Sequence, residues 1–319
     1  MGEAGAMEPI VRVRDGVQTE FNGSWHRGED PHWIPSKRDL QTPGAIDRYV
    51  LDGWLPERPF IDKATPVTAF GSCFAVNITN YLVARGYNLF GKTLDLDAHI
   101  VRFGEGIVNT FAIRQQFEWG LGVRELPDRL WWGGEAFAPL DPQVRATTRD
   151  IFQRTEVFII TVGLSEIWFD RATGEALWRA VPRKQFDPQA HGFRLSTVAE
   201  NRDNLLAVVG LIHALNPAAK VVFTLSPIPL MATFRPITCL TANAVSKAIL
   251  RVALDEVMAA VDRERVFYFP AYEVVTQFWP DPFIHDNRHP KQRVVDAIMR
   301  AFHRHYCLPE AAVSPPASG

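Results

Sequence analysis

The 319-residue sequence has few cysteines, little net charge and no long apolar run, and each absence excludes a class of protein. Cys73, Cys239 and Cys307 are widely spaced and form no C-x-x-C pair, which argues against a disulfide framework and a zinc ribbon. A formal net charge of −2 gives no general attraction to nucleic acid or to an anionic membrane. No apolar run approaches the roughly 20 residues that span a bilayer. The N-terminus lacks the basic and apolar parts of a signal peptide, so we expect a cytoplasmic protein.

The residues that are present suit a globular protein with a substantial core, since 47% are hydrophobic and 22% are charged. Residues 1 to about 61 are rich in Trp, Pro and Gly without sustained periodicity, and we expect an arm that packs its aromatic side chains on the body. The segment 309–319 is rich in small residues and in Pro, which predicts a disordered tail. Residues 62–308 are then the main domain. The sequence does not indicate an oligomeric state.

Strand-like and helix-like segments alternate through this domain. A β-rich run at 66–72 precedes helical spacing at 75–85, which Gly86 closes. The further segments expected to be strands are 87–90, 156–162, 220–225 and 265–269, and those expected to be helices are 110–119, 198–215, 242–261 and 291–305. This order favours a parallel sheet covered by helices on both faces. Residues 164–193 interrupt this alternation of strand-like and helix-like segments, which predicts a hairpin insertion or a lid.

Polar residues follow four of the expected strands. They are Ser72-Cys73, the segment 163–166, Ser226, and the loop that carries Asp286 and His289. Ligands of open parallel sheets bind beyond the carboxyl ends of the strands. We therefore expect these four segments to converge on one site.

Two nucleophiles lie at the first strand-to-helix turn, Gly71-Ser72-Cys73. A thiol at a helix N-terminus has a lowered pKa, which favours the reactive thiolate, whereas a serine needs a neighbouring imidazole as its base. The structural alternative is that Ser72 caps the helix and Cys73 is a small core residue.

The candidate base is His289, with Asp286 three residues earlier and Pro290 next. The carboxylate can accept from one ring nitrogen while the other faces the nucleophile. A capped surface loop would give the same pattern. A metal held by His285, Asp286 and His289 is a further alternative, although the chain has no H-E-x-x-H sequence. We expect no metal and no cofactor.

An oxyanion hole needs donors of hydrogen bonds. The segment 104–110 offers flexible backbone N–H groups, including that of Gly106, and the amide of Asn109. Ser165 and Glu166, after the strand that ends at Gly163, offer a second candidate group. As a dinucleotide site the segment 104–110 is weak, because G-x-G-x-x-N lacks the third glycine.

The sequence resembles the GSCFA family, a branch of the SGNH/GDSL hydrolase superfamily, over about residues 60–300. The segments that carry the resemblance are Phe70-Gly71-Ser72-Cys73-Phe74-Ala75, Gly106-Ile107-Val108-Asn109-Thr110, Thr161-Val162-Gly163-Leu164-Ser165-Glu166-Ile167-Trp168, Leu225-Ser226-Pro227-Ile228-Pro229, Ser246-Lys247-Ala248-Ile249-Leu250-Arg251, Phe269-Pro270-Ala271-Tyr272-Glu273 and Asp286-x-x-His289-Pro290. The resemblance implies a three-layer α/β/α sandwich of flavodoxin-like, SGNH hydrolase type with five parallel strands. It also implies ester hydrolysis or O-acyl transfer.

The chain departs from the superfamily pattern in two places. Related enzymes have Gly-Asp-Ser where this chain has Gly71-Ser72-Cys73, so Cys73 falls on the nucleophile and is preferred to Ser72. The related Gly-x-Asn-Asp segment is Gly-Leu-Ser-Glu at 163–166, without its oxyanion Asn, and Asn109 is the expected substitute. The prediction is a Cys73 (or Ser72)–His289–Asp286 triad acting on a small-molecule or saccharide acyl ester. The alternative is a binding module that kept the fold and lost the chemistry.

Overall fold

The computed structural model divides the chain into two compact units, residues 1–45 and 46–319. It describes residues 10–14, 17–21, 32–90, 96–102, 106–127, 129–130, 132–133, 136–137 and 140–309. The predicted tail therefore lies outside the described residues, apart from Pro309. No helix in the described ranges is both long enough and apolar enough to cross a membrane.

The smaller unit contains an antiparallel hairpin, β1 (Ile10–Arg14) and β2 (Val17–Phe21), and the short 3-10 helix η1 (Asp39–Gln41). The larger unit opens with a π-helical turn, η2 (Asp47–Leu51), in which Leu51 is fully buried. The segment predicted as one arm, residues 1–61, thus extends across the division between the units.

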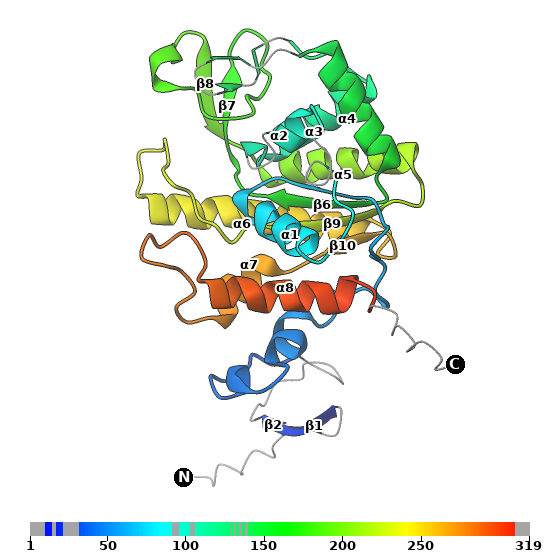
Figure 1. The fold of residues 1–319 in the computed structure, drawn as a ribbon. Coiled ribbons are helices and arrows are strands. Elements are labelled where there is room, and N and C mark those ends of the chain that lie inside the picture. The colour runs from blue at the N-terminus through cyan, green and yellow to red at the C-terminus, as the bar shows by residue number, and fades with distance from the viewer. Residues whose placement is uncertain are drawn as a thin grey trace, which may run out of the picture. The chain divides into compact units, whose positions relative to one another are not determined.

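Four parallel strands form the central sheet of the larger unit, in the order β10-β9-β6-β3 (Figure 1). Their bounds are Val67–Phe70 for β3, Val157–Val162 for β6, Lys220–Leu225 for β9 and Val266–Tyr268 for β10. The fifth strand expected at residues 87–90 is not formed. That segment pairs with β3 through a single bridge, Val67 to Leu89, because within the described residues its backbone hydrogen bonds to β3 involve Val67 alone: the N–H of Val67 donates to the carbonyl of Asn88, and the N–H of Phe90 donates to the carbonyl of Val67. The bridge lies at the edge where a fifth strand would have extended the sheet.

Helices cover both faces of this sheet and make the three-layer arrangement, as expected (Figure 1). Their bounds are α1 Cys73–Val83, α2 His99–Arg102, α3 Thr110–Leu121, α4 Pro142–Arg154, α5 Val198–Leu215, α6 Cys239–Ala260, α7 Ala271–Glu273, the π-helical η5 Val274–Phe278 and α8 Gln292–Tyr306.

The side chains of β6 show why both faces must be covered. Phe158, Ile160 and Val162 belong to the core beneath α3, α4, α5 and α6, whereas Val157 and Ile159 belong to the core beneath α1 and α8. Successive residues of a strand point to opposite faces of the sheet, and both faces of β6 are buried. The strand is therefore a continuous apolar run rather than an alternating one.

Helix α4 is not among the helices expected from the sequence. Its buried residues are confined to one narrow stripe, and the rest of the helix is polar. Its start does carry a local signal, because the Asp141 carboxylate accepts from the N–H groups of Gln143 and Val144 and Pro142 occupies the first turn.

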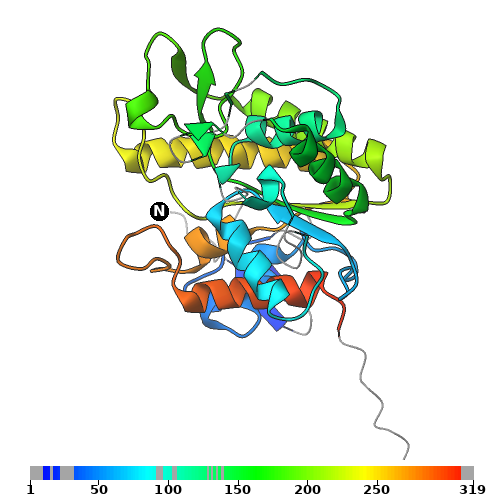
Figure 2. The same ribbon diagram turned by 45° about the horizontal axis from the view of Figure 1, so that its top comes forward.

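Residues 164–193, predicted as a hairpin insertion or a lid, contain most of an antiparallel hairpin. Strand β7 (Glu166–Asp170) pairs antiparallel with β8 (His191–Leu195), and the 3-10 helix η4 (Arg183–Gln185) lies between them. A smaller pair, β4 (Trp132–Gly133) and β5 (Ala136–Phe137), is also antiparallel. Both views show the β7–β8 hairpin on the side of the sheet that carries α3 to α6, away from α8 (Figure 1, Figure 2).

The two ends of the α/β body meet at the amino end of the sheet. The N–H groups of Phe60 and Ile61 donate to the carbonyl of Tyr306, and the N–H of Leu308 donates to the carbonyl of Ile61. Helix α8 therefore starts next to the loop that carries His289 and ends on the segment that leads into β3.

Candidate active site

Gly71 makes the turn from β3 to α1, and no other residue fits there. Its φ of 129° lies in a region that L side chains rarely adopt, and an added Cβ would lie 2.0 Å from the carbonyl oxygen of Thr161. This close approach holds the N-terminus of α1 against the carboxyl end of β6. The residues after Gly71 are thereby placed at the strand-end edge.

Ser72 is the N-cap of α1. Its backbone is extended and its Oγ accepts a hydrogen bond of 3.1 Å from the N–H of Phe74, which is the capping arrangement named as the structural alternative. Ser72 is also one of the residues that line a pocket at this edge. Cys73 is the first residue of α1, and its side chain lies outside the part of the structure that is described.

Asp286 and His289 form a hydrogen-bonded pair in the loop before α8. One carboxylate oxygen of Asp286 is 2.5 Å from Nδ1 of His289, and the other accepts from the N–H groups of Arg288 and His289 at 2.9 and 3.0 Å. Asn287 has a φ of 54°, which lets the chain turn within three residues. The hydrogen bond from the imidazole, followed by those from the backbone, holds the pKa of the Asp286 carboxyl well below its usual range.

This pairing defines the face that the imidazole leaves free. With the Asp286 carboxylate charged, the hydrogen bond assigns the proton of the neutral ring to Nδ1, so Nε2 remains as an acceptor. Nearly half of the His289 side chain surface is exposed. The neighbouring Arg288 lines the same pocket as Ser72, and its Nε donates to the carbonyl of Pro229. The structure therefore brings Ser72 and Arg288 to one pocket, whereas Asp286 and His289 themselves are not among the described residues that line it.

Gly106 and Asn109 line this pocket as well. The Asn109 Oδ1 accepts from the N–H of Ala112 at 2.8 Å and so caps α3, while its Nδ2 has no hydrogen-bond acceptor within the described residues. The carbonyl of Val108 accepts from the N–H of Gly163 at 2.8 Å, which fixes this segment to the end of β6. The fixed Asn109 amide is therefore a preorganised donor at the edge of the pocket.

The segment 163–166 turns directly beneath Ser72, and its two polar residues have different surroundings. An added Cβ on Gly163 would lie 3.6 Å from Cβ of Ser72. Ser165 is fully buried and is not among the pocket residues, because its N–H and its hydroxyl both donate to Oγ of Ser246, at 3.1 and 3.0 Å. Glu166 does line the pocket, and its carboxylate accepts from the hydroxyl of Thr233 at 2.7 Å.

Lys247 is a site residue to which the sequence analysis gave no role. Only 1% of it is exposed, and its Nζ donates to the carbonyls of Gly163 at 3.0 Å and Ser226 at 2.8 Å, so one side chain of α6 joins the ends of β6 and β9. Burial lowers the pKa of the Lys247 amine to about 7. The available signal was a lysine within an apolar helical stretch. We call residues 163–166 with Ser226, Ser246 and Lys247 the pocket floor.

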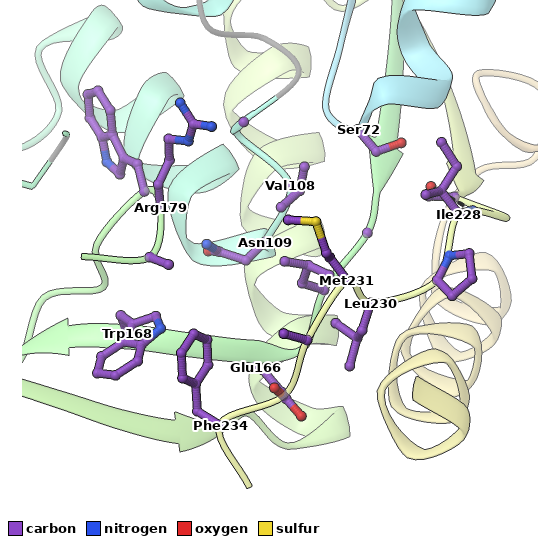
Figure 3. A pocket seen from close by; sticks show the side chains of 18 of the residues that line it. Ser72, Val108, Asn109, Glu166, Trp168, Arg179, Ile228, Leu230, Met231 and Phe234 are labelled. Carbon is purple, nitrogen blue, oxygen red and sulfur yellow. Dashed lines mark hydrogen bonds between the residues drawn. The ribbon is translucent and has the colours of Figure 1, made fainter. Parts of the chain in front are cut away.

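The pocket itself has a volume of about 360 Å³, within the range of small-molecule sites. Ser72 and Ile228 lie at one side of it, and Trp168 and Phe234 lie at the other (Figure 3). As for the metal alternative, the residues that the structure describes contain no group of three or more His, Cys, Asp or Glu side chains that could hold an ion.

Comparisons with known proteins give distant structural matches. The chain is similar to a candidate GDSL-like lipase from Parabacteroides merdae, at 9% identity and a TM-score of 0.37 over 78% of this chain and 98% of the other. A carbohydrate esterase of family 3 from Talaromyces cellulolyticus matches at 8% identity and a TM-score of 0.36 over 77% and 95%. A peptidoglycan O-acetylesterase matches at 13% identity and a TM-score of 0.29 over 50% and 41%. No curated protein matches the sequence. The family comparison covers most of the chain: the GSCFA family model matches residues 66–302, and the protein belongs to the GSCFA family.

Proposed function

We propose that the protein is an esterase or O-acyltransferase of the SGNH type. The observation that carries the proposal is the Asp286–His289 pair, in which the carboxylate engages Nδ1 and leaves Nε2 as a base. Arg288, the residue before His289 in this loop, lines the same pocket as Ser72. A nucleophile, an oriented imidazole and preorganised donors are what acyl transfer requires.

Cys73 is the preferred nucleophile and Ser72 the alternative. The Ser72 hydroxyl accepts the capping hydrogen bond of α1, the position and task that suit the Asp of a Gly-Asp-Ser sequence. Cys73 follows as the first residue of α1, where the helix dipole favours a thiolate. Because Ser72 accepts this hydrogen bond through its oxygen, its O–H remains available for transfer to a base. Ser72 and Cys73 are therefore both substituted in the test.

In the proposed reaction, Nε2 of His289 takes the proton of the Cys73 thiol as its sulfur attacks the ester carbonyl carbon. The carbonyl electron pair moves onto oxygen, where the N–H groups of Cys73 and Gly106 and the Asn109 amide stabilise the oxyanion. The C–O bond to the alcohol then breaks, and His289 returns the proton to the leaving oxygen. Water, or the hydroxyl of an acceptor, attacks the resulting thioester with His289 again as base, and the thiol is regenerated.

The alternative is a binding module without chemistry, and one observation favours it. Ser165, which stands where related enzymes have the oxyanion Asn, directs its donors at Ser246 instead of the pocket. The Asn109 amide is the compensating donor in our proposal. If Asn109 does not act in this way, the pocket would bind an ester or acid without transforming it.

The test is the hydrolysis of 4-nitrophenyl esters by the full chain and by four variants, His289→Ala, His285→Ala, Cys73→Ala and Ser72→Ala. We expect His289→Ala to reduce kcat/KM by about 10²–10⁴-fold. His285→Ala is the matched control, since this exposed histidine lies in the same loop with no assigned role, and it should retain the activity of the parent. Equal rates for His289→Ala and the parent would remove the catalytic proposal.

The nucleophile is identified by Cys73→Ala and Ser72→Ala in the same assay, together with alkylation by iodoacetamide at pH 6. Cys307 is a matched internal control, because it is buried and burial raises the pKa of its thiol to about 11. We expect Cys73 to be alkylated faster than Cys239 and Cys307. Full activity in Cys73→Ala with loss in Ser72→Ala would assign the reaction to the serine.

A further inference from the structure

Beyond its reacting end, the pocket is lined mostly by apolar side chains. They come mainly from the β7–β8 hairpin region and the segment after β9, and they include Trp168, Phe193, Leu230, Met231 and Phe234. Three charged residues also line it, Glu166, Arg179 and Arg288. The Glu166 carboxylate accepts from the hydroxyl of Thr233, and Nε of Arg288 donates to the carbonyl of Pro229.

Three of these side chains form a continuous aromatic surface, which we call the aromatic wall: Trp168, Phe193 and Phe234. The ring of Trp168 is 4.8 Å from that of Phe234 and 5.2 Å from that of Phe193, and the two Phe rings are 5.4 Å apart. The contacts are edge-to-face or tilted, the arrangements that aromatic pairs prefer. The hairpin and the segment after β9 thus contact each other through these rings and line one end of the pocket.

The proposed chemistry determines which part of an ester would contact the aromatic wall. His289 must return its proton to the leaving oxygen, so the alcohol part of the substrate lies toward the exposed imidazole. The acyl chain extends from the same carbonyl carbon in the opposite direction. From Ser72, the pocket extends past Leu230 and Met231 to Trp168 and Phe234 (Figure 3). An acyl chain along this path would contact mostly apolar carbon, with Glu166 and Arg179 as the charged residues beside it.

We propose that this pocket binds an apolar acyl group of several carbons, so that the substrate is an ester of a medium-chain acid rather than of acetic acid. The inference rests on the proposed function for its chemistry and on the aromatic wall for its selectivity. The alcohol part, which faces solvent, is left open to a saccharide or another polar alcohol.

The first test is a series of 4-nitrophenyl esters from acetyl to decanoyl. Each methylene that enters the pocket should raise kcat/KM roughly fourfold until the pocket is filled. Trp168→Ala and Phe234→Ala should lower the octanoyl-to-acetyl ratio at least tenfold. Ile237→Ala is the matched control, because this residue lies in the same segment as Phe234 but outside the pocket lining, and it should keep the ratio of the parent.

A binding measurement separates this inference from the proposed function. Sodium octanoate and sodium acetate are titrated calorimetrically into the parent and into Phe234→Ala. We expect octanoate to bind the parent about three orders of magnitude more tightly than acetate, and Phe234→Ala to lose most of that difference.

The outcomes are distinct. Tight octanoate binding without any ester hydrolysis would overturn the proposed function and support the acyl pocket. Hydrolysis that is fastest for the acetyl ester, with octanoate bound no more tightly than acetate, would overturn the acyl pocket and leave the esterase proposal standing. Absence of both hydrolysis and octanoate binding would overturn both.

Discussion

Ser165 and Trp168 lie three residues apart in the chain, yet Ser165 is buried beside the pocket and Trp168 lines it, in surroundings of opposite kinds. Ser165 is in the pocket floor, where its polar groups are buried and hydrogen-bonded to α6. Trp168 is in the aromatic wall, where contacts are between rings and Phe234 is 56% exposed. A floor of satisfied buried polar groups tolerates little change, because each lost partner leaves another group unpaired. A partly exposed wall can change with a smaller loss of stability.

The comparison suggests a division of tasks. The floor fixes the strand ends and the backbone near the reacting groups, so changes there should affect folding stability and the rate for every ester. Under the acyl-pocket proposal the wall would contact only the far end of the acyl chain, so changes there should affect the choice among esters. The variants below test this division, in order of decreasing expected effect on stability.

The largest loss should come from Gly71→Ala, which acts on the turn that rests against β6 at the floor. The new methyl would meet the carbonyl of Thr161 in a backbone conformation unfavourable for alanine, so we expect more than about 3 kcal/mol of destabilisation. Gly174→Ala is the control, because Gly174 also has a left-handed φ of 74° but nothing within 4 Å of an added Cβ. It should cost roughly 1 kcal/mol. Urea unfolding followed by tryptophan fluorescence measures both, and equal losses would contradict the close approach.

Lys247→Met tests the joining of β6 to β9. The variant leaves the carbonyls of Gly163 and Ser226 without this donor, which should cost about 1–3 kcal/mol for each group left unsatisfied, offset in part by removing a buried amine. The floor should then move, and kcat should fall for acetyl and octanoyl esters alike.

The lowered pKa of Lys247 predicts the sign of a pH effect. Between pH 7 and the ordinary pKa of 10.5, the unfolded chain holds a proton that the folded chain has released, so raising the pH favours folding. The cost of burying the charge is complete below pH 7 and disappears above 10.5. The parent should therefore gain stability relative to Lys247→Met between pH 7 and 10. A pH-independent difference in urea unfolding would show that the lysine keeps its ordinary pKa.

The pair Ser165 and Ser246 allows a double-mutant cycle within the floor. Ser246→Ala leaves the buried N–H and hydroxyl of Ser165 without their acceptor and should cost about 1–3 kcal/mol. Adding Ser165→Ala removes one of those orphaned donors, so the double variant should be less destabilised than the sum of the single variants. Additive losses in urea unfolding would mean that the two hydroxyls act independently.

The smallest effect on stability is expected in the wall. Phe234→Ala should cost less than about 1 kcal/mol, because more than half of the side chain surface is already exposed. It should nevertheless change the octanoyl-to-acetyl ratio more than any floor variant does. A loss of stability as large as that of Lys247→Met would remove the distinction between floor and wall.

Elements with strong local signals could be predicted to the residue. Helix α5 begins and ends where expected, because Thr197 and Glu200 form a capping box and Asn216-Pro217 stops the helix. Strand β9 is an uninterrupted apolar run ending at Ser226. Helix α4 was missed because its apolar stripe is narrow. The fifth strand was overpredicted because the composition of residues 87–90 does not reveal how many ladder bonds they make.

For the site, sequence could identify which segments meet but not the direction of each side chain. Ser72, Asn109 and Glu166 do line one pocket with Arg288, as the convergence of strand ends implies. The Ser165 hydroxyl points away from the pocket because it donates to Oγ of Ser246, 81 residues later in the chain. The sequence near Ser165 contains no signal for this contact. The same holds for Lys247, whose acceptors are the carbonyl oxygens of two strand ends.

The pairing of the segment after α8 with Phe60 and Ile61 has a practical consequence for presenting the protein on a surface. Helix α8 has 15 residues and runs from the His289 loop to the opposite end of the sheet, a distance on the order of 20 Å. A bead or sensor chip attached through Leu308 is therefore anchored at the amino end of the sheet, whereas the pocket lies at the carboxyl end. An immobilised preparation oriented in this way should admit bulky alcohols as freely as the protein in solution.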